Sequence, residues 1–98
     1  VSSTMTTRLE GLIDDLQREI PLPRSFILPG ASAASAAIDL ARTSARRAER
    51  EAVKLKERSE LTNLEILRYL NRLGDLLFMV ARYEDRDLPL EKLTSDEN

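Results

Sequence analysis

The sequence predicts an all-α protein, an antiparallel bundle with three helices, and three observations predict that fold class. Apolar residues recur every three or four positions in three separate stretches, which is the period of an amphipathic helix. No stretch alternates apolar and polar residues as a half-buried β-strand does. All four prolines lie outside those stretches, where they do not interrupt a helix.

The first helix is expected over about residues 5–20. Ser3 or Thr4 can cap its start. Pro21 and Pro23 end it, because proline lacks an amide hydrogen and restricts the residue before it. The apolar stripe of this helix, with Ile13 beside it, consists of Met5, Leu9, Leu12, Leu16 and Ile20.

Residues 21–30 are expected to link the first helix to the second. The linker carries a compact apolar run, Phe26, Ile27 and Leu28, between Pro23 and the pair Pro29-Gly30. A solvated linker has little reason to carry three such side chains. We therefore expect them to be buried against the bundle, a partner subunit or a ligand.

The second helix is expected over residues 32–57. It is poor in bulky apolar residues, and small residues on one stripe let a neighbouring helix approach closely. That property suits the centre of an assembly. The stripe follows a 4-3-4 spacing and consists of Ala41, Ala45, Ala48 and Ala52.

The third helix is expected to follow a break at residues 59–63, with Thr62 or Asn63 as its cap, and to end near Tyr83. Gly74 inside it costs up to about 1 kcal/mol relative to alanine. We therefore expect a close packing contact or a functional approach there. One face of the helix carries the apolar residues Leu64, Leu67, Leu70, Leu73, Leu77 and Val80.

Charge divides the chain into a helical domain, residues 1–83, and an acidic, flexible C-terminal tail, residues 84–98. The tail has six acidic and two basic residues, whereas residues 42–58 have seven basic and three acidic ones. This contrast predicts an anionic ligand for the second helix and a solvated tail.

The composition excludes several classes of site. Without cysteine there is no disulfide or thiolate metal site, and without histidine the commonest general base and transition-metal ligand are absent. Catalysis must then rely on carboxylates, arginines and positioning, and no metal-ligating residues are predicted. No apolar run approaches the length of a membrane span and no signal peptide is visible, so we expect a cytoplasmic location.

The sharpest cluster of candidate residues is Arg42, Arg46, Glu49 and Arg50 on the second helix. Offsets of zero, four, seven and eight place them on one face. Three stacked arginine forks make a triphosphate cradle, because each binds phosphate oxygens through paired charge-assisted hydrogen bonds. The alternative is a solvated face with ordinary helix ion pairs.

Two further features allow a functional and a structural interpretation. Asn71 and Asp75, with Arg72 between them, are close to the leucine face of the third helix, so Asn71 can hydrogen-bond either a ligand or another helix. Phe26 and Phe78 are the only phenylalanines. They either fill a core or form the wall of a site for a flat, apolar cofactor.

Two long motifs resemble the propanediol-utilisation-type ATP:cob(I)alamin adenosyltransferases. The run from Phe26 through Gly30, then Ala41-Arg-Thr43 and Arg46-Arg-Ala-Glu-Arg50, is similar to that family's FILPGG…ARTxxRRAER signature. The run Tyr69-Leu-Asn-Arg-Leu-Gly-Asp-Leu-Leu-Phe78, followed by Ala81-Arg-Tyr83, is similar to its YLNRLSDLLF…ARY segment. The similarity covers roughly residues 8–83.

The resemblance implies a homotrimer of five-helix bundles with active sites between subunits. It implies transfer of the 5′-deoxyadenosyl group of ATP to the cobalt of reduced cobalamin, giving adenosylcobalamin and tripolyphosphate, with Mg2+ accompanying the ATP. Because Co(I) is the nucleophile, the reaction requires no protein base. The absence of histidine and cysteine is therefore compatible with this chemistry.

The resemblance also implies residue roles. It places Arg42, Arg46 and Phe26 in the catalytic machinery, with Arg42 tied to the site through a salt bridge. Phe26 crowds the lower face of the corrin and Phe78 belongs to the same apolar wall. The ATP-contacting positions are Arg46, Arg47, Glu49, Arg50 and Asn71.

The sequence departs from the family at several points. Ala31 replaces a glycine, Gly74 a serine, and Asp39 a residue that is often histidine. The family's N-terminal phosphate loop, rich in glycine and threonine, and the first helices of its bundle have no counterpart here.

Two competing functions remain open from the residues alone. One is a non-enzymatic helical oligomerisation module, in which the alanine helix drives assembly. The other is nucleic-acid binding through residues 42–58. The negative net charge and the scarcity of aromatic residues argue against that second function, so no nucleic-acid partner is expected.

Overall fold

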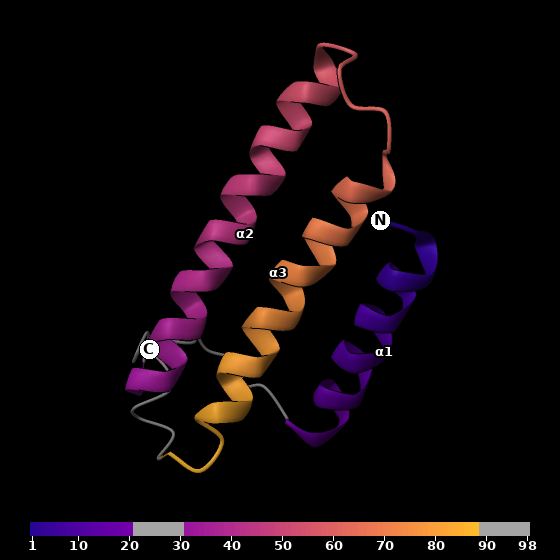
Figure 1. Ribbon diagram of the computed structural model, residues 1–98. Coiled ribbons are helices and arrows are strands. Elements are labelled where there is room, and N and C mark those ends of the chain that lie inside the picture. The colour runs from indigo at the N-terminus through magenta and orange to yellow at the C-terminus, as the bar shows by residue number, and fades with distance from the viewer. Residues whose placement is uncertain (21–30, 89–98) are drawn as a thin grey trace, which may run out of the picture.

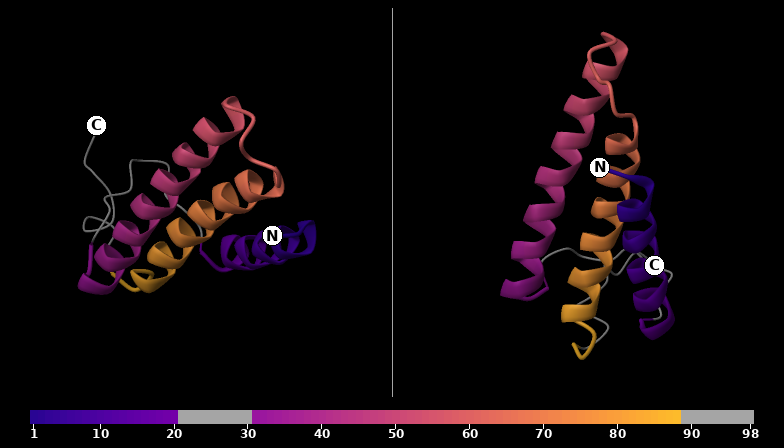
Figure 2. Two further views of the ribbon diagram at one scale, coloured as in Figure 1. Left: turned by 45° about the horizontal axis from the view of Figure 1, so that its top comes forward. Right: turned by 45° about the vertical axis from the view of Figure 1, so that its right-hand side comes forward.

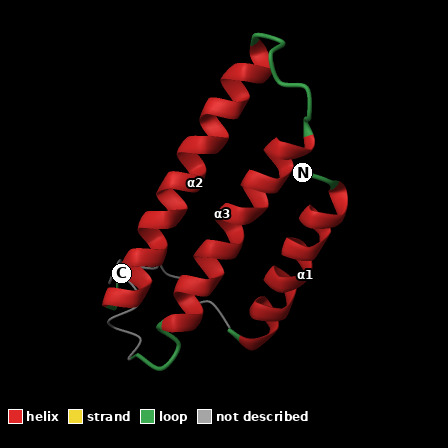
Figure 3. Cartoon of the chain, viewed as in Figure 1, coloured by secondary structure: helices red, strands yellow, loops and turns green. Residues whose placement is uncertain are grey.

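The computed structural model describes residues 1–20 and 31–88 of the chain (Figure 1). These residues form three helices, α1 (Ser3–Glu19), α2 (Ala33–Glu57) and α3 (Glu65–Glu84). The described segments contain no strand (Figure 3), so the predicted all-α class is confirmed. None of the described helices is long and apolar enough to cross a membrane.

The helices lie side by side, with α3 between α1 and α2 (Figures 1 and 2). In the described residues α1 and α2 do not pack against each other, and each contacts α3. Consecutive helices run in opposite directions, as predicted for an antiparallel bundle, but the neighbours α1 and α3 run parallel. Among the three described helices, α3 is therefore the one with a helix packed on two sides.

Helix α1 begins earlier than the sequence predicts and turns a different face inward. Ser3 and Thr4 lie inside its first turn and Ser2 is the N-cap, without a side-chain capping bond, so the predicted caps were wrong. The buried residues are Thr6, Leu9 and Ile13. Two predicted stripe residues, Met5 and Leu12, are 43% and 46% exposed because α1 has α3 as its one described neighbour.

Helix α2 begins at a capping box. The Ser32 side chain accepts a hydrogen bond from the Ser35 amide and the Ser35 hydroxyl accepts one from the Ser32 amide, which satisfies two otherwise unpaired donors. Ala45 and Ala52 are buried. Ala41 and Ala48 stay exposed, so about half of the predicted alanine stripe contacts α3.

Helix α3 buries its flanks rather than its leucine face. Its buried residues are Gly74, Met79, Ala81 and Arg82, whereas every member of the predicted stripe Leu64, Leu67, Leu70, Leu73, Leu77 and Val80 is at least partly exposed. The reason is geometric: the residues of α3 that contact α1 and α2 lie on other faces of the helix than the leucine stripe. The N-cap is Leu64 rather than the predicted Thr62 or Asn63. Asn63 still supports the helix start, because its Oδ1 accepts the Glu65 amide at 3.1 Å.

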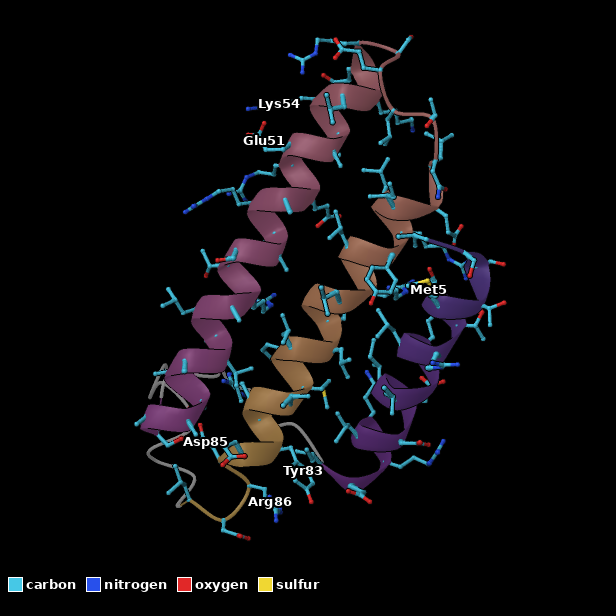
Figure 4. All side chains as sticks on the ribbon, in the orientation of Figure 1. Met5, Glu51, Lys54, Tyr83, Asp85 and Arg86 are labelled. Carbon is cyan, nitrogen blue, oxygen red and sulfur yellow. The ribbon has the colours of Figure 1, made fainter. Side chains whose placement is uncertain are left out.

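The described core is small and lies where the C-terminal halves of α1 and α3 meet. Ile13, Ile20 and Met79 are buried there, with Leu16, Leu76, Phe78 and Tyr83 packed around them. Just beyond, Asp85 is 1% exposed and accepts a 2.5 Å hydrogen bond from Ser32 Oγ, which ties the end of α3 to the start of α2 (Figure 4). The predicted linker 21–30 and residues 89–98 of the predicted tail lie outside the described residues.

Candidate functional site

An open groove of about 780 Å³ runs along one side of α3 between its two neighbours. Helix α3 supplies Arg72, Asp75 and the apolar residues Phe78 and Met79. Helix α1 contributes Glu10 and Asp14 among others, and α2 contributes Arg42. The groove therefore combines apolar side chains with charged side chains of both signs.

Phe78 contacts two guanidinium groups. Arg42 Cζ is 5.3 Å and Arg82 Cζ is 5.0 Å from the centroid of its ring, so both cations contact the aromatic ring electrostatically. The Nε atoms of Arg42 and Arg82 are buried and have no hydrogen-bond partner in the described part of the chain. The expected salt bridge of Arg42 finds no partner among residues 1–20 and 31–88.

Asp39 explains the position of Arg82. Its Oδ2 accepts a hydrogen bond from Arg82 Nη2 at 2.8 Å, and the two side chains are 15% and 5% exposed. The sequence singled out Asp39 as a departure with no assigned role. In the structure this carboxylate compensates the buried charge of the arginine that contacts Phe78.

The predicted residues Glu49 and Asn71 meet across α2 and α3. Asn71 Nδ2 donates to Glu49 Oε2 at 3.1 Å, although the two residues are 22 positions apart. Asn71 Oδ1 accepts from Arg72 Nη1 at 3.2 Å. Glu49 and Asn71, two of the five residues predicted to contact ATP, are thus part of one polar cluster.

Arg72 extends this cluster to the first helix. Its Nε donates to Glu10 Oε2 at 3.1 Å and its Nη1 to Asp75 Oδ2 at 3.0 Å. The hydrogen bond that Arg72 donates to Glu10, followed by the one that it donates to Asp75, raises the pKa of Arg72 above its ordinary value. Glu10 Oε1 also accepts from Arg68 at 3.1 Å. Sequence reasoning did not identify Glu10 because its partner lies 62 residues away.

The remaining predicted arginines have no partner in the described part of the chain. Arg46, Arg47 and Arg50 are exposed on α2, and none forms a hydrogen bond or ion pair with another described residue. The aliphatic part of Arg46 passes Gly74, where an added Cβ would lie 3.8 Å from Arg46 Cγ. Arg47 lies about 100° further around the helix than Arg46, so it faces a different direction.

The structure thus brings several of the predicted residues into pairwise contact. Arg42 and Phe78 share the groove, Glu49 and Asn71 share a hydrogen bond, and Arg46 packs beside Gly74 on α3. Phe26 lies outside the described residues. No group of three or more acidic side chains in the described segments is arranged to hold a metal ion.

Comparisons with known proteins agree on one family. The family model described as cobalamin adenosyltransferase matches residues 1–84. The corrinoid adenosyltransferase PduO of Citrobacter freundii is 45% identical over 87 residues, which are 89% of this chain and 26% of the relative. A corrinoid adenosyltransferase of Mycobacterium tuberculosis is 40% identical over 88 residues, again 89% of this chain and 46% of the relative.

Two solved structures of variants of a PduO-type ATP:corrinoid adenosyltransferase from Lactobacillus reuteri show the same fold. One, complexed with ATP, is 40% identical with a TM-score of 0.76 and covers 84% of this chain and 46% of that one. The other, complexed with cobalamin and ATP, is 39% identical with a TM-score of 0.75 and covers 91% and 46%. This chain spans between about a quarter and a half of the relatives it matches.

Proposed function

This chain belongs to the cobalamin adenosyltransferase family, and on that premise we propose that it serves the transfer of the 5′-deoxyadenosyl group from ATP to the cobalt of a reduced corrinoid. The relatives named above are corrinoid adenosyltransferases, and the two solved variants hold ATP, or ATP with cobalamin. Because the chain spans half of those structures or less, the activity of the whole protein is part of the proposal.

One observation carries the proposal: a polar cluster with unpaired arginines adjoins a groove that is lined in part by apolar side chains. Arg46 and Arg50 are unpaired among the described residues and lie beside the Glu49–Asn71 hydrogen bond. Phe78 lines the groove. A phosphate-binding surface next to a wall for a flat, apolar ligand matches a reaction between ATP and a corrinoid.

The proposed chemistry needs no acid or base from the protein. The cobalt(I) electron pair attacks C5′ of ATP, the Co–C bond forms as the C5′–O bond breaks, and the bonding pair leaves with tripolyphosphate. Negative charge grows on the leaving oxygen, so preorganised cations lower the barrier most effectively there. Arg46 and Arg50 are the proposed cations, with Glu49 and Asn71 fixing the nucleotide. Arg47 faces another direction, and its assignment to ATP rests on the motif alone.

The Mg2+ in this proposal accompanies the nucleotide rather than occupying a protein cage. Magnesium is usually held by substrate phosphates and one or two carboxylates. The described residues offer no larger acidic group for it. When bound, the ion neutralises phosphate charge, and the arginines do the same from the side of α2.

Corrinoid binding is assigned to Phe78 and Phe26, with Arg42 in a supporting catalytic role. Arg42 and Arg82 contact the Phe78 ring through their guanidinium groups, and Phe78 is one of the residues that line the groove. Phe26 remains assigned by the motif alone.

We also propose that the chain assembles as a homotrimer with sites between subunits. Support comes from the exposed small residues Ala41 and Ala48, which leave a smooth face on α2 for another helix. The leucine face of α3, which is only half-buried, offers a second apolar surface for a partner. The division into a domain of residues 1–83 and a tail of residues 84–98, and the cytoplasmic location, stay predictions.

The test is anaerobic incubation of the protein with chemically reduced cobalamin and MgATP, followed by the absorbance of adenosylcobalamin. Arg46→Ala is expected to weaken ATP binding about tenfold or more, because one charge-assisted contact is lost. Lys54→Ala is the matched control: it removes an exposed cation of the same helix whose ion-pair partner is Glu51, which is not a predicted site residue. Equal affinities in both variants would remove the phosphate role of Arg46.

The non-enzymatic oligomerisation module predicts a different outcome. It shares the exposed alanine face as its supporting observation. It predicts a stable oligomer that binds no ATP and forms no adenosylcobalamin, whereas the proposed function predicts both binding and product.

A further inference from the structure

The side-chain amide of Asn71 has a partner at each end. Its Nδ2 donates to Glu49 Oε2 at 3.1 Å, and its Oδ1 accepts from Arg72 Nη1 at 3.2 Å. A flipped amide would set oxygen against the Glu49 carboxylate and NH2 against the Arg72 guanidinium, two arrangements that repel. One orientation is therefore selected, and it leaves one N–H and one oxygen lone pair for a ligand.

Arg72 is itself held in place by two other residues. Its Nε donates to Glu10 Oε2 at 3.1 Å, and its Nη1 donates to Asp75 Oδ2 at 3.0 Å as well as to Asn71. Both Nη1 hydrogens are thereby used. A planar guanidinium bonded on two sides cannot rotate without breaking several of these bonds.

We infer that Arg72, anchored by Glu10, is a positioning residue that orients the Asn71 amide for the adenine nucleotide. The inference rests on the proposed ATP site and adds two residues to which that proposal gives no role. Glu10 belongs to α1, and α1 does not pack against α2, where the proposed phosphate contacts lie. Through Arg72 the first helix acts on the nucleotide without touching it.

The chain offers a matched control for Arg72. Arg68 lies one turn earlier on α3 and donates to the other oxygen of Glu10 at 3.1 Å and to Glu65 at 3.3 Å. It makes no bond to Asn71. The side chains of Arg68 and Arg72 are 49% and 39% exposed, and ion pairs this exposed contribute little to stability. Arg72→Gln and Arg68→Gln should therefore both fold.

The first experiment observes the amide directly by heteronuclear NMR. The sequence has only three asparagines and one glutamine, so its side-chain NH2 signals are few, and Asn71→Ala identifies the signal of Asn71. We expect Arg72→Gln to shift this signal and Arg68→Gln to leave it in place. An Asn71 signal at the same position in both variants would overturn the inference without any reference to ATP.

The second experiment measures MgATP affinity by isothermal titration calorimetry. Arg72→Gln is expected to weaken binding about tenfold, as for the loss of one oriented hydrogen bond, and Arg68→Gln less than about twofold. The MgATP affinity of Glu10→Gln should lie between those of the two arginine variants, since the glutamine keeps one oxygen that can accept from Arg72.

The outcomes separate this inference from the proposed function. If Asn71→Ala weakens ATP binding but the two arginine variants bind alike, the positioning role is wrong and the ATP site stands. If Asn71→Ala binds ATP as tightly as the unmodified protein, the assignment of Asn71 to the nucleotide fails, and the inference fails with it.

Discussion

Replacing Asp39 with alanine should destabilise this protein more than replacing any exposed charged residue. Asp39 and Arg82 form the most buried ion pair among the described residues, at 2.8 Å and with side chains 15% and 5% exposed. Without Asp39, the guanidinium stays buried, and its Nε already lacks a hydrogen-bond partner there. Breaking a buried pair on one side costs about 3–5 kcal/mol, and the partial exposure of Asp39 places the expected loss near the lower value.

That loss is large for a chain of this size. A domain of 60–100 residues loses roughly 4–8 °C of Tm for each kcal/mol, so Asp39→Ala should lower Tm by about 12 °C or more. Urea unfolding followed by far-UV circular dichroism, at fixed protein concentration, measures the change in the free energy of unfolding. An unchanged m-value would show that the compactness of the two states is unaltered.

A double-mutant cycle isolates the pair from other effects of each substitution. In Asp39→Leu with Arg82→Met, neither charge remains and both side chains stay apolar, so most of the stability should return. The reasoning is refuted if Asp39→Ala costs less than about 0.5 kcal/mol, a typical surface value. The reasoning is equally refuted if the stability losses of Asp39→Leu and Arg82→Met, each measured alone, add up to the loss of the double variant.

Three further predictions concern other positions. Gly74→Ala should stabilise the protein by about 0.5–1 kcal/mol, measured by urea unfolding, because an added Cβ meets only Arg46 Cγ at an ordinary 3.8 Å; a loss of stability would reveal a closer contact. Ala48→Glu should disrupt the oligomer in sedimentation experiments and keep the helix content, since Ala48 is exposed, whereas Ala45→Glu should unfold the chain, since Ala45 is 8% exposed. Phe78→Ala should slow adenosylation while changing ATP affinity less than about twofold, because its aromatic contacts in the groove are to arginines and not to Asn71; a parallel loss of ATP affinity would contradict its assignment to the corrinoid.

Most of the helical organisation was predictable because it depends on local chemistry. The second helix was expected over residues 32–57 and occupies Ala33–Glu57 with Ser32 as its cap, since a serine cap acts within one turn. The expected start of the first helix was wrong because several serines and threonines there compete as caps. The motif that places Glu49 on one helix and Asn71 on another was also visible, and their hydrogen bond agrees with it.

The choice of buried face was less predictable. Periodicity identifies an apolar stripe but not the neighbour that covers it. The leucines of α3 form the strongest stripe in the sequence, yet α1 and α2 flank it, and the described residues leave it half-exposed. For the same reason Met5 and Leu12 point outward, and Thr6 is buried.

The sequence by itself determined the helical class, the approximate helix limits, the family and the basic face of α2, because these follow from spacing and residue type along the chain. The tertiary structure alone decided which charges meet. Glu10 reaches Asn71 through Arg72, and Asp39 holds Arg82 against Phe78, across separations of 62 and 43 residues. No periodicity encodes such pairs, since they depend on the relative rotation and register of packed helices.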